Sequence, residues 1–172
     1  SMFAFCTTIE VLKVNNLNAT GASFPSSLGD CRRLKMLKLS VHGWRGSIPS
    51  PIWQLPHLQQ LTIRDIGRVL VRPDALSGPY QLDWSWPSAT FGFCNPAASG
   101  IIGIHISGIG LKGRIPASIG ACAASLQFLN INDTSLEGPL PSTLGNLTQL
   151  RGLWLSQNNH LTGRIPDTLG EN

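Results

Sequence analysis

A recurring proline constrains the fold of this chain more than any other feature. Five segments share the pattern G-x-I-P-x-x-L-G or a close variant, and their prolines stand at positions 25, 49, 116, 141 and 166. The spacings between these prolines are 24, 67, 25 and 25 residues. A fixed period in this range indicates a solenoid, in which each repeat buries its apolar side only against its neighbours. The sequence therefore predicts one domain of stacked repeats.

A strand pattern of the form L-x-x-L-x-L recurs along the chain with the same period. Its last two apolar positions alternate with residues that face outward, as a strand with one buried face requires. Six such strands predict a parallel sheet with one buried and one open face. Their apolar positions are Ile9/Leu12/Val14, Leu34/Leu37/Leu39, Leu58/Leu61/Ile63, Ile101/Ile104/Ile106, Leu126/Leu129/Ile131 and Leu150/Leu153/Leu155.

The strand pattern and the proline segments together resemble the plant-type leucine-rich repeat, L-x-x-L-x-x-L-x-L-x-x-N-x-L-x-G-x-I-P. The resemblance implies an α/β solenoid, right-handed and curved, with a parallel β-sheet on its concave face. Members of this family are receptor kinases, receptor-like proteins and secreted inhibitors that bind peptides, proteins or small hormones. The asparagine that usually follows the strand is His42, Ile109 and Thr134 in three repeats. We therefore expect gaps in the buried side-chain ladder that this asparagine forms.

One long spacing interrupts the repeat. Leu58 and Ile101 are 43 residues apart, about 19 more than one repeat. We expect regular repeats over residues 1–63 and 101–172, with an irregular island over about 64–100. The end of the island, with Trp84, Trp86 and Cys94, resembles the segment that caps many such ectodomains but lacks the second cysteine of those caps. In the repeat before the island, Trp44 and Trp53 occupy a leucine and a glycine position, which predicts packing in the core.

Three of the four cysteines are predicted to be unpaired, and none is predicted to pair with Cys94 within this chain. Cys6, Cys31 and Cys122 occupy the position that leucine fills in other repeats, so we expect them to act as small buried apolar residues. The alternative is a Cys6–Cys31 disulfide, because stacked repeats bring equivalent positions close together. Cys94 is the odd cysteine, and its partner is expected outside this chain.

Composition and glycosylation motifs favour an extracellular protein. No apolar run is long enough to span a bilayer, so a membrane attachment would lie outside this sequence. Three N-x-[ST] motifs predict N-linked glycans at Asn18, Asn132 and Asn146. Residues 1–75 hold nine Lys/Arg and four Asp/Glu, a net charge of +5, and the remainder holds four and five, a net charge of −1; the basic half fits either a scattered surface charge or an acidic partner. Nucleic acid is not expected, because no basic stripe with interleaved aromatics is present.

Motifs for catalysis or cofactors are weak, and we expect neither an enzyme nor a cofactor. The segment from Gly108 to Gly113 matches G-x-G-x-x-G, but Ile115 and Pro116 follow it where a dinucleotide site needs a helix. The four histidines lie in different repeats without metal-ligand spacing. Asp133 and Glu137 are expected to be solvated surface residues.

The outward positions of the strands supply the candidate ligand site. Phe128 and Trp154 face outward on neighbouring strands, which fits either a binding hot spot or a pair whose rings cover each other. Basic residues gather on the other half of the sheet and would bind an acidic peptide or a carboxylate. The predicted ligand-binding residues are Phe128, Trp154, His105, Asn130, Arg64, Lys38 and Lys13.

The function that these features favour is recognition of a peptide or protein ligand by a receptor-type ectodomain fragment, with a co-receptor as a further partner. A structural or adhesive role in a wall, matrix or filament is the first alternative. A secreted inhibitor of wall-degrading enzymes is the second.

Overall fold

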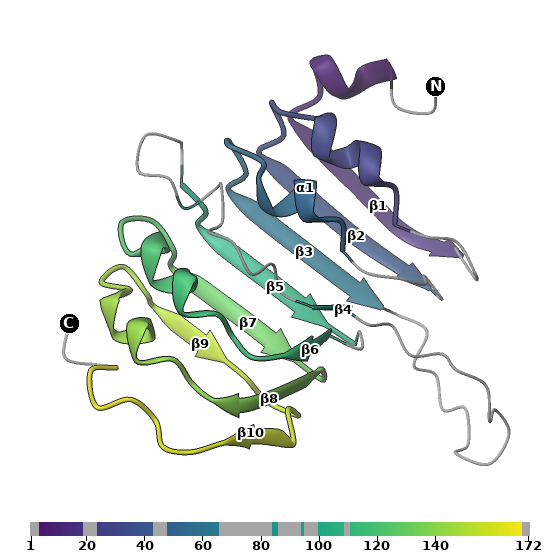
Figure 1. Cartoon of the computed structure of the whole chain (residues 1–172). Coiled ribbons are helices and arrows are strands. Elements are labelled where there is room, and N and C mark those ends of the chain that lie inside the picture. Colours follow the sequence, from purple (N-terminus) through teal and green to yellow (C-terminus); the bar gives the residue numbers. More distant parts are fainter. Residues whose placement is uncertain are drawn as a thin grey trace, which may run out of the picture.

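The computed structural model shows the six predicted strands side by side in one curved parallel sheet (Figure 1). The structure describes residues 4–18, 24–42, 48–65, 84–85, 94, 100–108 and 111–169. The strand order follows the chain, as stacked repeats require. The strands of this larger sheet are β1 (Val11–Asn18), β2 (Met36–His42), β3 (Gln60–Asp65), β5 (Gly103–Ser107), β7 (Phe128–Asn132) and β9 (Gly152–Trp154).

The core is a ladder of aliphatic side chains behind this sheet. Leu37 pairs in register with Leu61, Leu61 with Ile104, and Ile104 with Leu129, and each of the four is at most 1% exposed. Side chains alternate between the faces of a strand, so the residues between these positions point to the open side. The predicted alternation and the six-stranded sheet are confirmed.

A second, smaller parallel sheet lies beyond the carboxyl ends of these strands (Figure 1), and the sequence did not predict it. A glycine with positive φ occurs in or just after three of its four strands: φ is 87° at Gly113, 73° at Gly138 and 81° at Gly163. Residues with a Cβ rarely adopt this conformation, which explains the glycine of the G-x-I-P pattern. Its order is β10-β8-β6-β4, with β4 (Trp84–Ser85), β6 (Leu111–Gly113), β8 (Ser135–Pro139) and β10 (His160–Thr162).

The Gly108–Gly113 segment leads into a strand of this second sheet. β6 occupies Leu111–Gly113, where a dinucleotide site would need the first turn of a helix. Gly113 is thus the ordinary glycine of the repeat, as the sequence predicted.

Short helices cover the side of the repeats that lies near the starts of the strands (Figure 1). Four of them begin directly after a proline of the repeat, whose extended backbone has φ between −60° and −73°. All are 3-10 helices except α1. They are η1 (Ala4–Thr7), η2 (Ser26–Asp30), α1 (Ser50–Trp53), η4 (Ala117–Cys122) and η5 (Ser142–Asn146).

Glycines let these helices approach one another closely. A Cβ on Gly120 would lie 2.8 Å from both Cβ and the carbonyl oxygen of Thr143 in the next repeat. The equivalent position is Trp53 in the second repeat, and this side chain is 1% exposed. The prediction that Trp53 packs in the core is confirmed, whereas Trp44 lies outside the described residues.

The asparagine ladder is present at the C-terminal repeats. Asn158 is 8% exposed, and its Nδ2 donates to the carbonyl oxygens of Ile131 at 2.7 Å and Leu155 at 3.0 Å. Thr134, which replaces the asparagine one repeat earlier, donates its hydroxyl hydrogen to Asn158 Oδ1. The threonine therefore continues the polar ladder with a shorter side chain.

The cysteines form two disulfides, so the prediction of unpaired cysteines is wrong. Cys6 bonds Cys31, with 4.2 Å between the Cα atoms, and Cys94 bonds Cys122, with 4.4 Å. All four are buried, as predicted for Cys6, Cys31 and Cys122. The physical reason for the pairing is that equivalent positions of stacked repeats lie at bridging distance. The alternative Cys6–Cys31 pairing is confirmed, and the partner of Cys94 lies within this chain.

The end of the predicted island is tied to the repeat that follows it. In β4, Trp84 pairs with Leu111 of β6, and Cys94 bonds Cys122. From Trp84 to Ile101 there are 17 positions, close to the 15 from Leu111 to Leu126. The residues in excess of one repeat therefore fall between β3 and β4, at positions 66–83, which lie outside the described residues.

Candidate functional site

The concave face of the larger sheet carries all seven predicted ligand-binding residues. Neighbouring strands lie about 4.8 Å apart, so paired residues on this face form rows across the sheet. Arg64 lies in a third row, beside Ser40 and Ser107. The middle row consists of Lys13, Lys38, Thr62, His105, Asn130 and Trp154. The first row consists of Val11, Met36, Gln60, Gly103, Phe128 and Gly152.

The N-terminal half of this face is basic. Lys13 and Lys38 are paired across β1 and β2, and Arg64 follows on β3. The first and middle rows contain no Asp or Glu, and the ion pairs of the described residues leave these three cations without a carboxylate partner. Like charges on neighbouring strands repel, so this half favours an anionic group from outside.

His105 is held by Arg64. Arg64 Nε donates to His105 Nε2 at 3.0 Å, so this imidazole is neutral and carries its proton on Nδ1. Burial lowers the pKa of His105 below its ordinary value, and the positive charges of Arg64 and Lys38 lower it further. The structure thus joins two of the predicted residues in one hydrogen bond, which the sequence did not indicate.

Titration of His105 tests this arrangement. We expect the pKa of His105, measured by NMR, to lie below the ordinary value for histidine and to rise in an Arg64→Ala variant. Because the pKa is lower in the folded state, the unfolded chain binds the proton more readily. The contribution of His105 to stability is therefore fully present above the unfolded-state pKa and is lost as the pH falls from that value through the lower folded-state pKa. An unchanged pKa in Arg64→Ala would contradict the contact.

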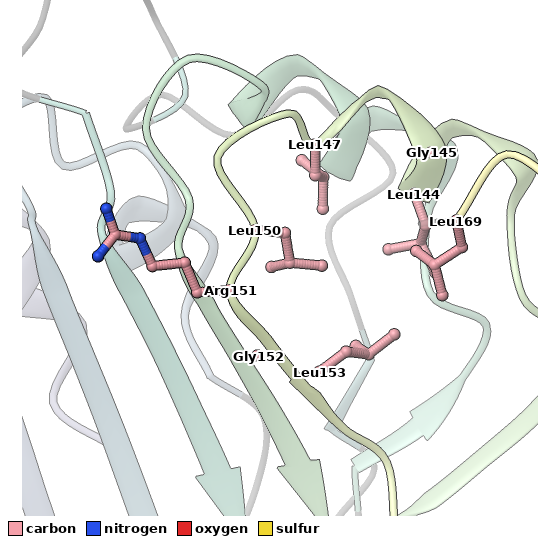
Figure 2. A pocket seen from close by; sticks show the side chains of 8 residues that line it. All are labelled: Leu144, Gly145, Leu147, Leu150, Arg151, Gly152, Leu153 and Leu169. Carbon is pink, nitrogen blue, oxygen red and sulfur yellow. The ribbon is translucent and has the colours of Figure 1, made fainter. Parts of the chain in front are cut away.

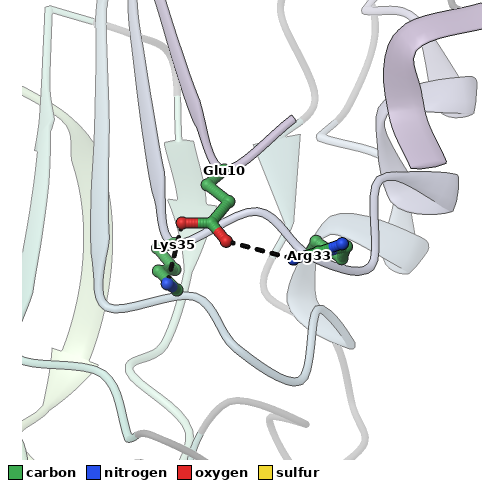
Figure 3. A network of polar contacts seen from close by, with 3 residues as sticks. All are labelled: Glu10, Arg33 and Lys35. Atoms are coloured by element: carbon green, nitrogen blue, oxygen red, sulfur yellow. Dashed lines mark hydrogen bonds and ion pairs between the residues drawn. The ribbon is translucent and has the colours of Figure 1, made fainter. Parts of the chain in front are cut away.

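Two basic residues outside the concave face, Arg33 and Lys35, form ion pairs with a carboxylate. Glu10, just before β1, accepts from Lys35 Nζ at 2.8 Å and lies 3.4 Å from Arg33 Nη2 (Figure 3). The hydrogen bond from Lys35 is the main cause that lowers the pKa of Glu10, and its charge and that of Arg33 add to it. These exposed ion pairs contribute little to stability. They show that the chain supplies a carboxylate to Lys35, although the described residues supply none to Lys38.

The C-terminal half of the face is aromatic. Phe128 and Trp154 are stacked, with ring centroids 6.4 Å apart and an angle of 24° between the planes. The rings cover each other, as one of the two alternatives predicted, and still remain 42% and 46% exposed, so the binding hot spot stays a prediction. Exposed aromatic pairs of this kind are typical anchors of protein interfaces.

Two glycines beside the aromatic pair were not recognised as part of the site. The ring of Trp154 lies so close over Gly152 that a Cβ there would collide with it. At Gly103, on the other side of Phe128, a Cβ would meet no atom within 4 Å. Outward glycines next to an outward aromatic residue were the available signal in the sequence.

Polar side chains connect the aromatic half to the strand ends. Asn132 Nδ2 donates to Asn130 Oδ1 at 2.6 Å, and Asn132 Oδ1 accepts from the backbone N–H of Ser156 at 2.8 Å. Asn132 therefore lies on the concave face with its amide in use. A glycan on Asn132 would stand beside the predicted ligand site, whereas Asn18 and Asn146 are exposed at the ends of β1 and η5.

Two apolar hollows among the described residues lie at the C-terminal edge of the stack. The first has a volume of about 310 Å³. Figure 2 shows that the side chains of Leu147, Leu150 and Leu153 point into this hollow and that Arg151 points away from it. A second hollow of about 330 Å³ adjoins Leu153 and Leu155. Leu150, Leu153 and Leu155 are half-buried, whereas their equivalents in the preceding repeat are fully buried. The hollows thus mark the apolar edge of the last described repeat, and the first of them adjoins Gly152 beside the predicted ligand site.

Within the described ranges, no three His, Cys, Asp or Glu side chains gather as potential metal ligands. Among the same residues, none of the helices has the length and apolar character needed to cross a membrane.

Comparison with known proteins finds one family model and several solved structures that resemble parts of this chain. The family model named Leucine Rich Repeat matches residues 125–147, and no curated protein matches the chain. The ectodomain of the Arabidopsis receptor kinase HAESA, in complex with an extended IDA peptide hormone, is 29% identical over 92% of this chain, with a TM-score of 0.65. HAESA with IDA and the co-receptor SERK1 is 26% identical over 94% of this chain, with a TM-score of 0.56.

A third solved structure supports the fold. The ectodomain of GASSHO1/SCHENGEN3 from Arabidopsis thaliana, in complex with CASPARIAN STRIP INTEGRITY FACTOR 2, is 24% identical over 96% of this chain, with a TM-score of 0.64. This chain spans 23%, 27% and 17% of the three solved chains, in the order given. The repeat pattern, the two parallel sheets and these similarities show that the chain has the leucine-rich-repeat solenoid fold, which the solved plant receptor-kinase ectodomains share.

Proposed function

We propose that this chain is an extracellular recognition module that binds a peptide or protein ligand on its concave face, as part of a receptor-type ectodomain. The observation that carries the proposal is the stacked pair Phe128 and Trp154, which remains exposed on β7 and the edge strand β9. A rigid parallel sheet holds these rings without a cost in ordering a loop, which favours binding.

The similar structures support the ligand class. The solved HAESA ectodomain holds the peptide hormone IDA, and one of its complexes also contains the co-receptor SERK1. By this likeness we propose a peptide or protein as ligand and a co-receptor as a further partner. The concave face of this chain offers a peptide two kinds of contact, cationic on β2 and β3 and aromatic on β7 and β9.

The disulfides support the proposed compartment. Bonds such as Cys6–Cys31 and Cys94–Cys122 persist in oxidising environments and are rare in the cytosol. We propose secretion or an ectodomain location, with N-linked glycans on exposed Asn18 and Asn146. A glycan on Asn132, the third predicted acceptor, would restrict access to the aromatic half of the face.

A double variant with Phe128→Glu and Trp154→Glu tests the recognition function. We expect the secreted wild-type chain to capture one partner from an extracellular extract and the variant to lose it, with at least a hundredfold weaker binding of that purified partner. Two carboxylates would replace the apolar anchors, while the core behind them stays intact.

The matched control is Ile165→Glu, because Ile165 is 69% exposed and lies away from the concave face. It should capture the same partner as the wild type. Capture that survives in the double variant would contradict recognition by this face. If the wild type only associates with itself, the apolar edge at Leu150 and Leu153 would favour the alternative of an assembly role instead.

A further inference from the structure

Gly103 leaves a vacant position in the first row of the concave face. It lies on β5 between Gln60 and Phe128, with which it pairs in register. A Cβ on Gly103 would meet no atom within 4 Å, and its backbone is not among the positive-φ glycines. Neither crowding nor backbone conformation therefore requires glycine here. In a strand, glycine also costs stability relative to residues with a side chain.

The empty space above Gly103 lies beside the exposed ring of Phe128. On the β9 side, the stacked ring of Trp154 supports Phe128 and fills the space above Gly152. On the β5 side, the register position next to Phe128 is Gly103, which has no side chain. The first row thus has room for one apolar side chain of a ligand, which would lie on the backbone of Gly103 and contact the ring of Phe128.

The cationic residues lie at a defined distance from this position. Lys38, in the middle row on β2, is two strand spacings across and two residues along from Gly103, or about 12 Å. Arg64, in the third row on β3, is one strand spacing across and four residues along from Gly103, or about 14 Å. An extended peptide advances about 3.3 Å per residue, so these distances correspond to three or four residues.

We propose that the concave face selects an extended peptide that presents an apolar side chain and an acidic side chain three or four residues apart. The apolar side chain lies over Gly103 against Phe128, and the acidic side chain binds Lys38 and Arg64. This inference rests on the peptide-binding function proposed above and adds the chemistry of the ligand. Gly103 then determines specificity, because any larger residue would fill the space that the ligand needs.

Selection from a random library of displayed dodecapeptides tests the proposal. On the immobilised wild-type chain, we expect enriched peptides to carry Asp or Glu three or four positions from an aromatic or aliphatic residue. Gly103→Val should bind the best selected peptide at least tenfold more weakly while it melts no lower than the wild type. The double variant Lys38→Gln, Arg64→Gln should lose the preference for peptides with an acidic residue, and its binding should depend less on salt.

The matched control is Ser107→Val, which adds a branched side chain to the same strand in the third row. It should retain the wild-type affinity for the selected peptide. Enriched peptides without an acidic residue, or equal affinity of Gly103→Val and wild type, would overturn the inference. If the partner from the capture experiment binds Gly103→Val normally but not the Phe128→Glu, Trp154→Glu variant, the recognition function stands and this ligand chemistry is wrong. If that double variant also retains the partner, the proposed function itself fails.

Discussion

Replacing both Cys94 and Cys122 by serine is expected to lower the free energy of unfolding by about 3.5 kcal/mol. The bond closes a loop over a sequence separation of 28 residues, and its loss restores conformational freedom to the unfolded chain. It also connects the end of the long segment between β3 and β5 to the fourth repeat. Urea unfolding followed by circular dichroism gives the difference, and a non-reducing peptide map identifies the bond.

The N-terminal disulfide is the matched comparison. Cys6 and Cys31 are separated by 25 residues, so their replacement by serine should cost about the same, near 3.5 kcal/mol. A Cys94→Ser, Cys122→Ser chain that unfolds at the wild-type urea concentration, or a map in which Cys94 is linked to another cysteine, would contradict the assigned pairing.

Leu61→Ala is expected to lower the free energy of unfolding by about 3 to 4 kcal/mol. Leu61 is fully buried in β3, between the paired residues Leu37 and Ile104. Its truncation removes buried apolar contact and leaves a cavity that flanking repeats cannot fill, since their own leucines are held in register. The same urea titration measures the effect.

Gln60→Ala on the same strand is the control. Gln60 is exposed on the concave side, so its replacement should change the unfolding free energy by no more than about 0.5 kcal/mol. Similar losses for Gln60→Ala and Leu61→Ala would mean that β3 is shifted by one residue, because a shift of one exchanges its two faces.

The strands and their faces could be predicted from the sequence because each depends on a local repeat. Leu61, Ile104 and Leu129 recur at fixed positions, and alternation then places Lys38, His105 and Trp154 outward. The second sheet could not be predicted, since β6 and β8 are short and Ser135–Pro139 has the composition of a turn.

The disulfides were missed for a different physical reason. A cysteine in the leucine position is equally suited to an apolar core and to a bond with the repeat above it. Cys94 is 28 residues from Cys122, a spacing that does not match the period of about 25 and so hides their equivalence.

Within the candidate site, the sequence predicted which residues face the concave side but not how they interact. The hydrogen bond from Arg64 to His105 joins residues 41 positions apart, across the long segment whose path the sequence does not indicate. The different roles of Gly103 and Gly152 depend on the orientation of one indole ring, which no sequence pattern specifies.

The placement of the two covalent bonds has a mechanical consequence for the concave face. Cys6–Cys31 joins the repeats of β1 and β2, and Cys94–Cys122 joins the segment before β5 to the repeat of β7, so the repeat of β9 with Trp154 has no disulfide to its neighbour. When the stack is pulled along its axis, we expect the repeat of β9 to separate from the repeat of β7 first, because neighbouring repeats contribute stability independently. Lys13 and Lys38 stay together on strands whose repeats are joined by a disulfide. Tension on the protein is therefore expected to separate Trp154 from Phe128 before it separates Lys13 from Lys38.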